Sequence, residues 1–262
     1  MILDLFRMDG KVAVVSAAGR GIGARIATAF AECGADVVIG ARTADQLADV
    51  ASQVEALGRR AVAVEGDLGS REGMATLVEA ATAEMGGIDV VVNNAGGTMP
   101  QAFMDTTEAA FDHALRWNVT TAFNLTQLAV PHMIERGGGS VINITSVAGS
   151  FSSRGFAAYG TAKGALMKLT RHLAMDLAPK ITVNSISPGS IMTSARDMVL
   201  QMPAIEKAMV DATPLGRLGT VDDIAAAAVY LASPAGSYVT GRDIRVDGGI
   251  EGSNLEMPIP DL

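Results

Sequence analysis

The stretch that decides the fold runs from residue 12 to residue 23 and reads VAVVSAAGRGIG. Its first four residues form an uncharged, valine-rich run typical of a buried strand, and Gly19, Gly21 and Gly23 then lead into an apolar, helix-like segment. Glycines at such a turn let backbone N–H groups and the positive end of a helix approach a phosphate closely. Taken alone the turn is a weak signal, because glycines also serve simply to fit tight backbone.

Six further apolar runs alternate with longer helix-like stretches. The seven candidate strands are residues 12–15, 37–39, 61–64, 88–92, 141–144, 181–186 and 244–246. Their hydrophobicity is nearly continuous, as strands covered by helices on both faces require, and the intervening helices imply parallel, right-handed crossovers. The sequence therefore predicts an α/β fold with a doubly wound, seven-stranded parallel sheet.

The organisation of the chain favours one nucleotide-binding domain over residues 1–262, because no repeat, charge block or Ser/Pro-rich linker divides it. Within this domain we expect residues 190–215 to form a lid over the substrate and residues 250–262 to be an irregular tail. Gly34 is typical of a helix end, and two capping boxes are predicted, Thr43 with Gln46 and Thr220 with Asp223.

Composition narrows the class of partner. The net charge of −8 at pH 7 opposes binding to nucleic acid or to an anionic membrane surface, so a small-molecule partner is expected. A single cysteine excludes an intramolecular disulfide, and the three scattered histidines show no zinc-like spacing, so no metal site is expected.

The location expected from the sequence is the cytoplasm. Residues 1–10 carry charges where a secretory signal would be apolar, and the longest apolar run, residues 224–232, falls far short of the ~20 residues that span a bilayer.

The end of the second strand bears on the choice of cofactor. It reads Gly40-Ala41-Arg42-Thr43, with no Asp or Glu to accept hydrogen bonds from an adenosine ribose. Arg42 could instead pair with a 2′-phosphate, and Arg20 in the glycine turn adds a second positive charge. The pair favours NADP(H), with NAD(H) as the runner-up; the alternative is that both arginines are ordinary solvated charges.

A second set of residues can carry acid/base chemistry. Ser146 follows the fifth strand, and Tyr159 and Lys163 lie four residues apart, so in a helix they share one face. A nearby ammonium favours the phenolate, which makes tyrosine usable for proton transfer, and Ser146 could hold the substrate oxygen. Taken singly, such a spacing also occurs by chance, and Ser146 could be a helix cap.

Together these segments resemble the short-chain dehydrogenase/reductase family, in its single-domain form, along nearly the whole chain up to about Gly249. The resemblance rests on motifs in the family's order and spacing: residues 16–23, Asp67-Leu68, Asn93-Asn94-Ala95-Gly96, Asn118, Ser146, Tyr159 with Lys163, Pro188-Gly189 and Thr193. One departure is visible, since the usual Thr-Gly opening of the turn reads Ser16-Ala17, and Ala17 needs a φ compatible with a Cβ.

The resemblance implies a role for each catalytic position. Tyr159 is the general acid/base, and Lys163 lowers its pKa and binds the nicotinamide ribose. Ser146 orients the carbonyl, and Asn118 holds a water in a proton relay. It also implies that Asn93 braces the central strand, and that the protein is a homo-oligomer, usually a tetramer.

The cofactor contacts that the resemblance and the residues imply fall into four groups. They are the turn residues Ser16, Gly19, Arg20, Gly21, Ile22 and Gly23 with Arg42; Asp67 and Leu68 at the adenine; Asn94 beside the adenosine ribose; and Ile191, Thr193, Tyr159 and Lys163 around the nicotinamide end.

Substrate choice is less defined by the sequence. Residues 94–97, 188–193 and 214–219 are similar both to bacterial hydroxysteroid dehydrogenases and to 3-oxoacyl carrier-protein reductases. The expected lid is rich in Met192, Met198, Leu200, Met202, Ile205 and Met209, a composition that adapts to bulky apolar ligands but also suits a helix packed on the protein itself.

The function predicted is hydride transfer between NADP(H) and a secondary alcohol or its ketone, with a hydroxysteroid or other bulky apolar alcohol as the hypothesis. The alternatives are a 3-oxoacyl-thioester reductase, a non-catalytic dinucleotide-binding regulator, and an epimerase or dehydratase on the same scaffold.

Overall fold

A seven-stranded parallel sheet forms the centre of the molecule in the computed structural model, which describes residues 1–193, 203–254 and 259. The strands of this sheet are β1 (Val12–Ser16), β2 (Asp36–Ala41), β3 (Ala61–Glu65), β4 (Val90–Asn93), β5 (Gly139–Ile144), β6 (Ile181–Pro188) and β9 (Asp243–Val246). Their spatial order is β3-β2-β1-β4-β5-β6-β9, and every neighbouring pair is parallel. The predicted fold class and all seven predicted strands are confirmed.

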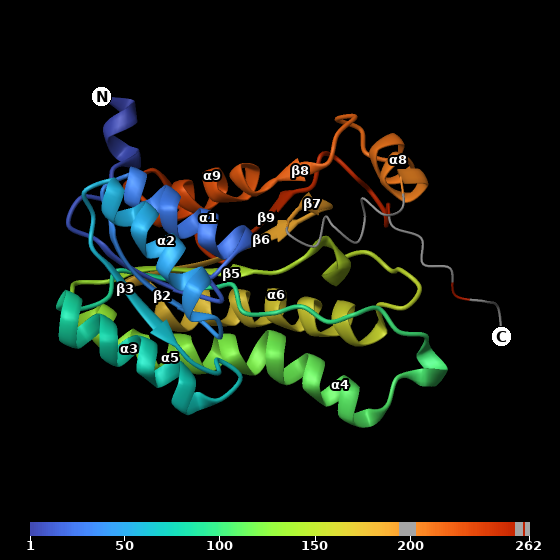
Figure 1. Ribbon diagram of the computed structural model, residues 1–262, viewed down its shortest axis with the longest axis horizontal. Coiled ribbons are helices and arrows are strands. Elements are labelled where there is room, and N and C mark those ends of the chain that lie inside the picture. Colours follow the sequence, from blue (N-terminus) through green and yellow to red (C-terminus); the bar gives the residue numbers. More distant parts are fainter. Residues whose placement is uncertain (194–202, 255–258, 260–262) are drawn as a thin grey trace.

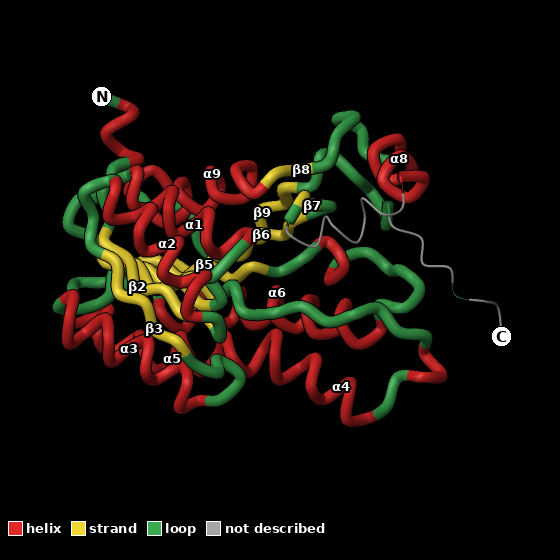
Figure 2. Tube along the Cα trace, viewed as in Figure 1, coloured by secondary structure: helices red, strands yellow, loops and turns green. Residues whose placement is uncertain are grey.

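Helices cover both faces of the sheet (Figures 1 and 2). The helices are α1 (Gly21–Glu32), α2 (Ala44–Ala56), α3 (Arg71–Met85), α4 (Glu108–Leu115), α5 (Thr121–Glu135), α6 (Ala157–Leu177), α8 (Pro203–Asp211) and α9 (Val221–Ala232). Short helical turns add η1 (Ile2–Phe6), η2 (Phe103–Asp105), η3 (Arg116–Thr120), η4 (Val147–Gly149) and η5 (Pro234–Gly236). Helices α1, α2 and α9 lie on one face, and α3, α5 and α6 lie on the other.

Strand β1 shows why the apolar runs are continuous. Ala13 and Val15 point into the core shared with α1, α2 and α9, whereas Val12 and Val14 point into the core shared with α3, α5 and α6. Successive side chains of a strand face opposite sides of its sheet, so both sets must be apolar when both faces are covered.

The order of the strands places the site. Chain connections run outward in opposite directions from the adjacent strands β1 and β4, which makes a topological switch point at the centre of the sheet. The glycine turn follows β1 and the segment Asn94-Ala95-Gly96 follows β4, so both lie at the crevice beyond the carboxyl ends of these strands.

A buried ladder of amides braces the same strands. Asn93 donates through Nδ2 to Thr126 Oγ1 at 2.9 Å and to Asn143 Oδ1 at 2.8 Å, and Asn143 donates to Thr170 Oγ1 at 2.8 Å. The ladder links β4 and β5 to α5 and α6, which confirms the bracing role predicted for Asn93.

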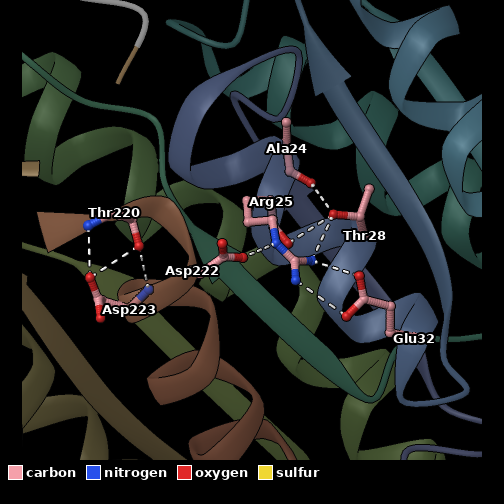
Figure 3. Close-up of polar contacts among 7 residues, drawn as sticks. All are labelled: Ala24, Arg25, Thr28, Glu32, Thr220, Asp222 and Asp223. Atoms are coloured by element: carbon pink, nitrogen blue, oxygen red, sulfur yellow. Dashed lines mark hydrogen bonds and ion pairs between the residues drawn. The ribbon is translucent and has the colours of Figure 1, made fainter. Parts of the chain in front are cut away.

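The helix boundaries test the predicted caps. Gly34 follows α1 with φ +103°, and Thr220 with Asp223 forms the predicted capping box at the start of α9 (Figure 3). The box predicted at Thr43 is wrong: Thr43 precedes α2 but makes no side-chain capping bond. Gln46 instead lies against the glycine turn, where its Oε1 would be 3.1 Å from a Cβ on Gly19.

The regions expected as lid and tail are partly described. Strand β7 (Ile191–Met192) pairs with β8 (Gly219–Thr220) in a small sheet that the sequence did not predict, and α8 lies between these two strands in the chain. Residues 194–202, with Met198, Leu200 and Met202, lie outside the described residues, whereas residues 250–254 contain no helix or strand. In the described ranges, no helix combines the length and hydropathy that crossing a bilayer requires.

Candidate active site

The glycine turn forms a cradle that side chains would fill. A Cβ on Gly23 would lie 2.5 Å from Asn94 Nδ2 and 2.7 Å from the carbonyl oxygen of Ala17, and Gly21 has φ +60°. The N-cap of α1, Arg20, makes no side-chain capping bond. The first turn of α1 therefore keeps backbone N–H groups available to an anion, as a dinucleotide phosphate requires.

The side chain of Ser16 is hydrogen-bonded within the fold. Its hydroxyl is fully buried, donates to Val92 O at 3.2 Å, and accepts from the backbone N–H groups of Asn94 and Ala95 at 3.0 and 3.1 Å. The hydroxyl thus joins the ends of β1 and β4, and a direct contact with a cofactor would require breaking these bonds. Asn94, expected beside a ribose, donates through Nδ2 to Ala17 O at 2.9 Å and so also holds the turn.

Ala17 occupies a strained position. Its φ is +52°, and it is the one non-glycine residue with positive φ among the described residues. The left-handed region brings Cβ close to the backbone and costs roughly 1–2 kcal/mol for an L-residue. The departure from the family's usual glycine is therefore a real local conflict rather than a change that the backbone accommodates.

Two exposed arginines lie on the rim of the turn. Ala18 N donates to Gly40 O at 2.9 Å, and Gly19 lies so close to β2 that a Cβ on it would be 3.1 Å from Ala41 Cβ. Arg20 follows Gly19 and Arg42 follows Ala41, and both arginines are exposed. Neither guanidinium has a hydrogen-bond or ion-pair partner within the described part of the chain.

The remaining predicted cofactor residues lie around the same crevice. Asp67 follows β3, and its Oδ1 accepts from Gly69 N at 2.9 Å, while the neighbouring Leu68 is buried in the core. On the other side, Ile191 belongs to β7, and Thr193 packs 3.9 Å from the position of a Cβ on Gly21.

Asn118 is positioned by an irregular helix. It lies in η3, a π-helical turn between α4 and α5, a feature that often marks functional sites. The side chain is fully buried; its Oδ1 accepts from Gly97 N at 2.8 Å and its Nδ2 donates to Ala114 O at 2.9 Å.

Gly96 brings Asn118 and Lys163 together. A Cβ at this position would lie 2.7 Å from Asn118 Oδ1 and 2.8 Å from Lys163 Nζ. Only a glycine allows both polar groups to approach the carboxyl end of β4, so the glycine after Ala95 is a packing requirement of the site.

Tyr159 lies in the first turn of α6, beside Ser146 at the end of β5. The phenol and the Ser146 side chain line the same cavity. Burial raises the pKa of Tyr159 above its usual value of 10, and the nearby Ser146 hydroxyl opposes that rise in part. The phenol is therefore protonated at neutral pH. Ser146 also caps η4, accepting from Ala148 N at 3.2 Å, so the cap and the proposed role coexist.

Lys163 was predicted to act as a charged ammonium beside Tyr159, and its surroundings affect that charge. Its Nζ is buried, lies 5.7 Å from the centre of the Tyr159 ring, and donates to Ile144 O at 2.8 Å. Burial lowers the pKa of Lys163 to about 7. The predicted lowering of the Tyr159 pKa by Lys163 is not seen in the chain alone, because desolvation governs both groups and leaves the ammonium only partly protonated near neutral pH.

A cavity of about 220 Å³ opens in front of Tyr159 and Ser146. Its apolar lining is Val147, Ala148, Phe151, Phe156, Met209 and Ile250, and its neutral polar lining is Ser153, Ser190, Ser253 and Asn254, with Gly189 at the end of β6. We call this the substrate pocket. Of these residues the sequence singled out Gly189, through the Pro188-Gly189 motif, and Met209 and Ser190, within the expected lid; the phenylalanines and the tail carried no recognisable motif.

In the described part of the chain, no three His, Cys, Asp or Glu side chains gather as possible metal ligands. The site is thus a phosphate cradle, a buried Tyr, Ser, Lys and Asn set, and a mainly apolar pocket, all at the carboxyl edge of one sheet.

The family model described as enoyl-(acyl carrier protein) reductase matches residues 16–251. The chain belongs to the short-chain dehydrogenase/reductase family. An uncharacterized oxidoreductase of Mycobacterium tuberculosis is 54% identical over the full length of both chains. The 7α-hydroxysteroid dehydrogenase of Escherichia coli K12 is 41% identical over 94% of this chain and 96% of its own. The resemblance inferred from the motifs is confirmed, and the chain is an oxidoreductase of the NAD(P)-dependent kind.

Solved structures of the family share the whole fold. A 7α-hydroxysteroid dehydrogenase complexed with NADH and 7-oxo glycochenodeoxycholic acid superposes with a TM-score of 0.91 at 41% identity, covering 96% of this chain and 98% of the other. A gluconate 5-dehydrogenase from Burkholderia cenocepacia, in complex with NADP and tartrate, gives 0.89 at 34% identity over 95% and 98%. The relatives therefore differ in both cofactor and substrate.

Proposed function

We propose that this chain reduces a bulky, mainly apolar ketone, and oxidises the corresponding secondary alcohol, with NADP(H). The observation that carries the proposal is that Tyr159 and Ser146 line one pocket whose described lining contains no charged side chain. A neutral lining suits an apolar substrate body better than an anionic polyol such as gluconate, which would lose its hydration without a cationic partner.

The site residues fit a nicotinamide dinucleotide. The Gly19 to Gly23 cradle at the start of α1 suits a pyrophosphate, and the exposed Arg20 and Arg42 suit a 2′-phosphate, since guanidinium binds phosphate oxygens with two parallel hydrogen bonds. When bound, the dinucleotide supplies the hydride for the carbonyl carbon or accepts it from the alcohol carbon. Lys163 Nζ lies beside Gly96, directly after β4, where it can hold a ribose hydroxyl.

The protein's own groups manage the proton. Tyr159, protonated at neutral pH, donates its proton to the ketone oxygen as that oxygen gains negative charge, while Ser146 holds the oxygen in place. In the reverse direction the phenolate is needed, so alcohol oxidation is expected to rise with pH. Asn118, anchored between Gly97 and Ala114, orders a route for the proton from Lys163 to solvent.

A substrate panel tests the proposal. Wild-type protein with NADPH is offered 7-oxo glycochenodeoxycholic acid, cyclohexanone, 5-ketogluconate and acetoacetyl thioester, and loss of nicotinamide absorbance is followed. The bulky ketone is expected to give the highest kcat/KM. Activity confined to the thioester would support the rival 3-oxoacyl-thioester reductase, and activity confined to the sugar acid would contradict the apolar substrate.

A non-catalytic regulator is the second candidate that the panel addresses, because it would bind NADPH without any turnover. The complete Tyr159, Ser146, Lys163 and Asn118 set favours an enzyme, since binding alone needs no proton donor. The lid over residues 190–215, the homotetramer and the cytoplasmic location stay predictions; light scattering of the purified protein measures the oligomeric state.

A further inference from the structure

The segment that follows β9 forms part of the substrate pocket. Ile250 is 4% exposed, and Ile250, Ser253 and Asn254 all line the cavity in front of Tyr159. In the sequence this segment reads as an irregular tail with no motif. The contact between this segment and the pocket is therefore visible in the structure but not in the sequence.

Asn254 is held by three hydrogen bonds to two different parts of the pocket. Its Oδ1 accepts from Ser190 Oγ at 2.7 Å, just beyond β6. Its Nδ2 donates to Thr213 Oγ1 at 3.1 Å and to Met209 O at 3.3 Å, both at the end of α8. Both ends of the amide are used, so the side chain fixes the tail to α8 and to the strand end behind it.

The tail also contacts the opposite wall of the pocket. Ser253 Oγ donates to Ser153 Oγ at 3.0 Å, and Ile259 Cδ1 would lie 2.8 Å from a Cβ on Gly155. Ser153 and Gly155 belong to the loop between η4 and α6, and α6 carries Tyr159. The described tail residues thus link the α8 side of the pocket to the α6 side.

We propose that residues 250–254 form a substrate-selecting wall of the pocket and that Asn254 is its positioning residue. The wall contributes the apolar side chain of Ile250 and the neutral polar groups of Ser253 and Asn254, so it contacts the apolar body of a bulky ketone and leaves a small ketone untouched. This proposal rests on the proposed function, because it assigns the substrate class of the same site.

The test compares three variants with wild-type protein. Asn254→Ala removes all three bonds, and Asn254→Asp keeps an acceptor for Ser190 while removing the donors to α8. Asn124→Ala, on α5, removes an amide that accepts one hydrogen bond from Arg71 and does not line the pocket, so it is the matched control. Binding of 7-oxo glycochenodeoxycholic acid and of cyclohexanone to the NADPH-loaded protein is measured by calorimetry, together with kcat and KM for each ketone.

Asn254→Ala is expected to weaken binding of the bulky ketone about tenfold, because hydrogen bonds of about 1 kcal/mol each no longer order the wall. Asn254→Asp should weaken it less. The Kd for NADPH, the kcat/KM for cyclohexanone and all values for Asn124→Ala should stay within about twofold of wild type. Equal losses on both ketones would show that Asn254 only supports the fold, and no loss on either would likewise overturn the proposal.

Failure of the proposed function has a separate signature. A wild-type protein that binds NADPH and the bulky ketone but reduces neither ketone contradicts the proposed reaction. In that case the effect of Asn254→Ala on the Kd of each ketone, measured by calorimetry, still tests the role of the wall. A wild-type protein that reduces cyclohexanone but shows no binding of the bulky ketone overturns the wall while leaving the reaction in place.

Discussion

The Lys163 ammonium nitrogen lies 5.7 Å from the centre of the Tyr159 ring while it donates to the carbonyl oxygen of Ile144 at 2.8 Å. Ile144 ends β5, two residues before Ser146, so one side chain of α6 is tied to the strand that presents Ser146. Lys163 therefore fixes the distance between the helix that carries the phenol and the strand that carries its hydroxyl partner.

Replacing Tyr159 by Phe should lower kcat for ketone reduction by about 10²–10⁴-fold, because the proton donor is lost while the ring that packs 6.1 Å from Phe156 is kept. Fluorescence titration should give a Kd for NADPH within about twofold of wild type. Tyr238→Phe, at a fully exposed position, is the control. Undiminished turnover of Tyr159→Phe would remove this residue from the mechanism.

The lowered pKa of Lys163 predicts a pH-dependent stability. Between about pH 7 and 10.5 the unfolded chain holds a proton on this amine that the folded chain does not, so the free energy of unfolding increases with pH across that window. Below pH 7 both states hold the proton, and the cost of burying the charge is largest. Lys163→Met removes this cost.

Chemical denaturation at several pH values measures the effect. The stability of Lys163→Met relative to wild type should be greatest below pH 7 and should shrink by a few kcal/mol as the pH approaches 10.5. Lys168→Met, on the exposed face of the same helix, should show no such trend. A constant difference from pH 6 to 10 would mean that Lys163 keeps its ordinary pKa.

Arg42 and Arg20 are expected to make NADPH bind more tightly than NADH. Arg42→Ala is expected to weaken NADPH binding at least tenfold, as the loss of a charged hydrogen bond of about 1.5–3 kcal/mol requires, and to leave NADH within about twofold. Arg20→Ala should act in the same direction. Arg171→Ala, exposed on α6, is the control. Tighter binding of NADH than of NADPH by wild-type protein would refute the proposed preference.

Ala17→Gly should raise the free energy of unfolding by about 1 kcal/mol, because glycine adopts φ +52° without a Cβ clash. Ala18→Gly, next along the chain and buried, has no positive φ to relieve and should lower stability by a similar amount. Thermal and chemical denaturation give both values. A loss of stability in Ala17→Gly would show that the methyl group contributes more through packing than it costs in strain.

Arg25, on α1, links that helix to the start of α9. Its guanidinium bonds to Asp222 on α9, to Glu32 at 3.0 and 3.2 Å, and to Thr28 at 3.1 Å (Figure 3). Helix α9 starts directly after β8, which pairs with β7. Arg25 therefore helps to fix the distance between the glycine turn and the segment that contains β7 and Thr193.

Arg25→Met should lower stability by about 1 kcal/mol and weaken NADPH binding several-fold, since a partly exposed ion pair contributes little to folding but holds α9 in place. Glu32→Gln removes the negative charge that pairs with Arg25 within α1, keeps the bond to Asp222, and should leave the Kd for NADPH within about twofold. If both variants bind NADPH like wild type, the link is structural alone.

The sequence was informative where one residue type answers one local demand. The valine-rich runs predicted all seven strands, because a strand buried on both faces must be apolar at every position. The Thr220 and Asp223 pair was also predicted correctly, since a capping box depends on only four consecutive residues. The same reasoning failed at Thr43, where Gln46 turns toward Gly19, a neighbour that no local pattern reveals.

Motifs identified the site residues, but they did not predict the hydrogen-bond partners or the burial of those residues. The sequence placed Ser16 at a phosphate, whereas the fold buries its hydroxyl between β1 and β4. It gave Lys163 the task of lowering the Tyr159 pKa, whereas burial sets the pKa of both groups. Desolvation depends on every element packed around a group, and those elements come from distant parts of the chain.

The sequence by itself determined the doubly wound sheet, the glycine turn after β1 and the family's order of Asn118, Ser146, Tyr159 and Lys163. Only the tertiary structure decided that Gly96 lets Asn118 and Lys163 meet, that a π-helical turn presents Asn118, and that Asn254 closes a wall of the pocket. The reason is physical: periodicity and turn chemistry act between near neighbours, whereas approach, burial and pocket shape arise from contacts between segments that are close only once the chain has folded.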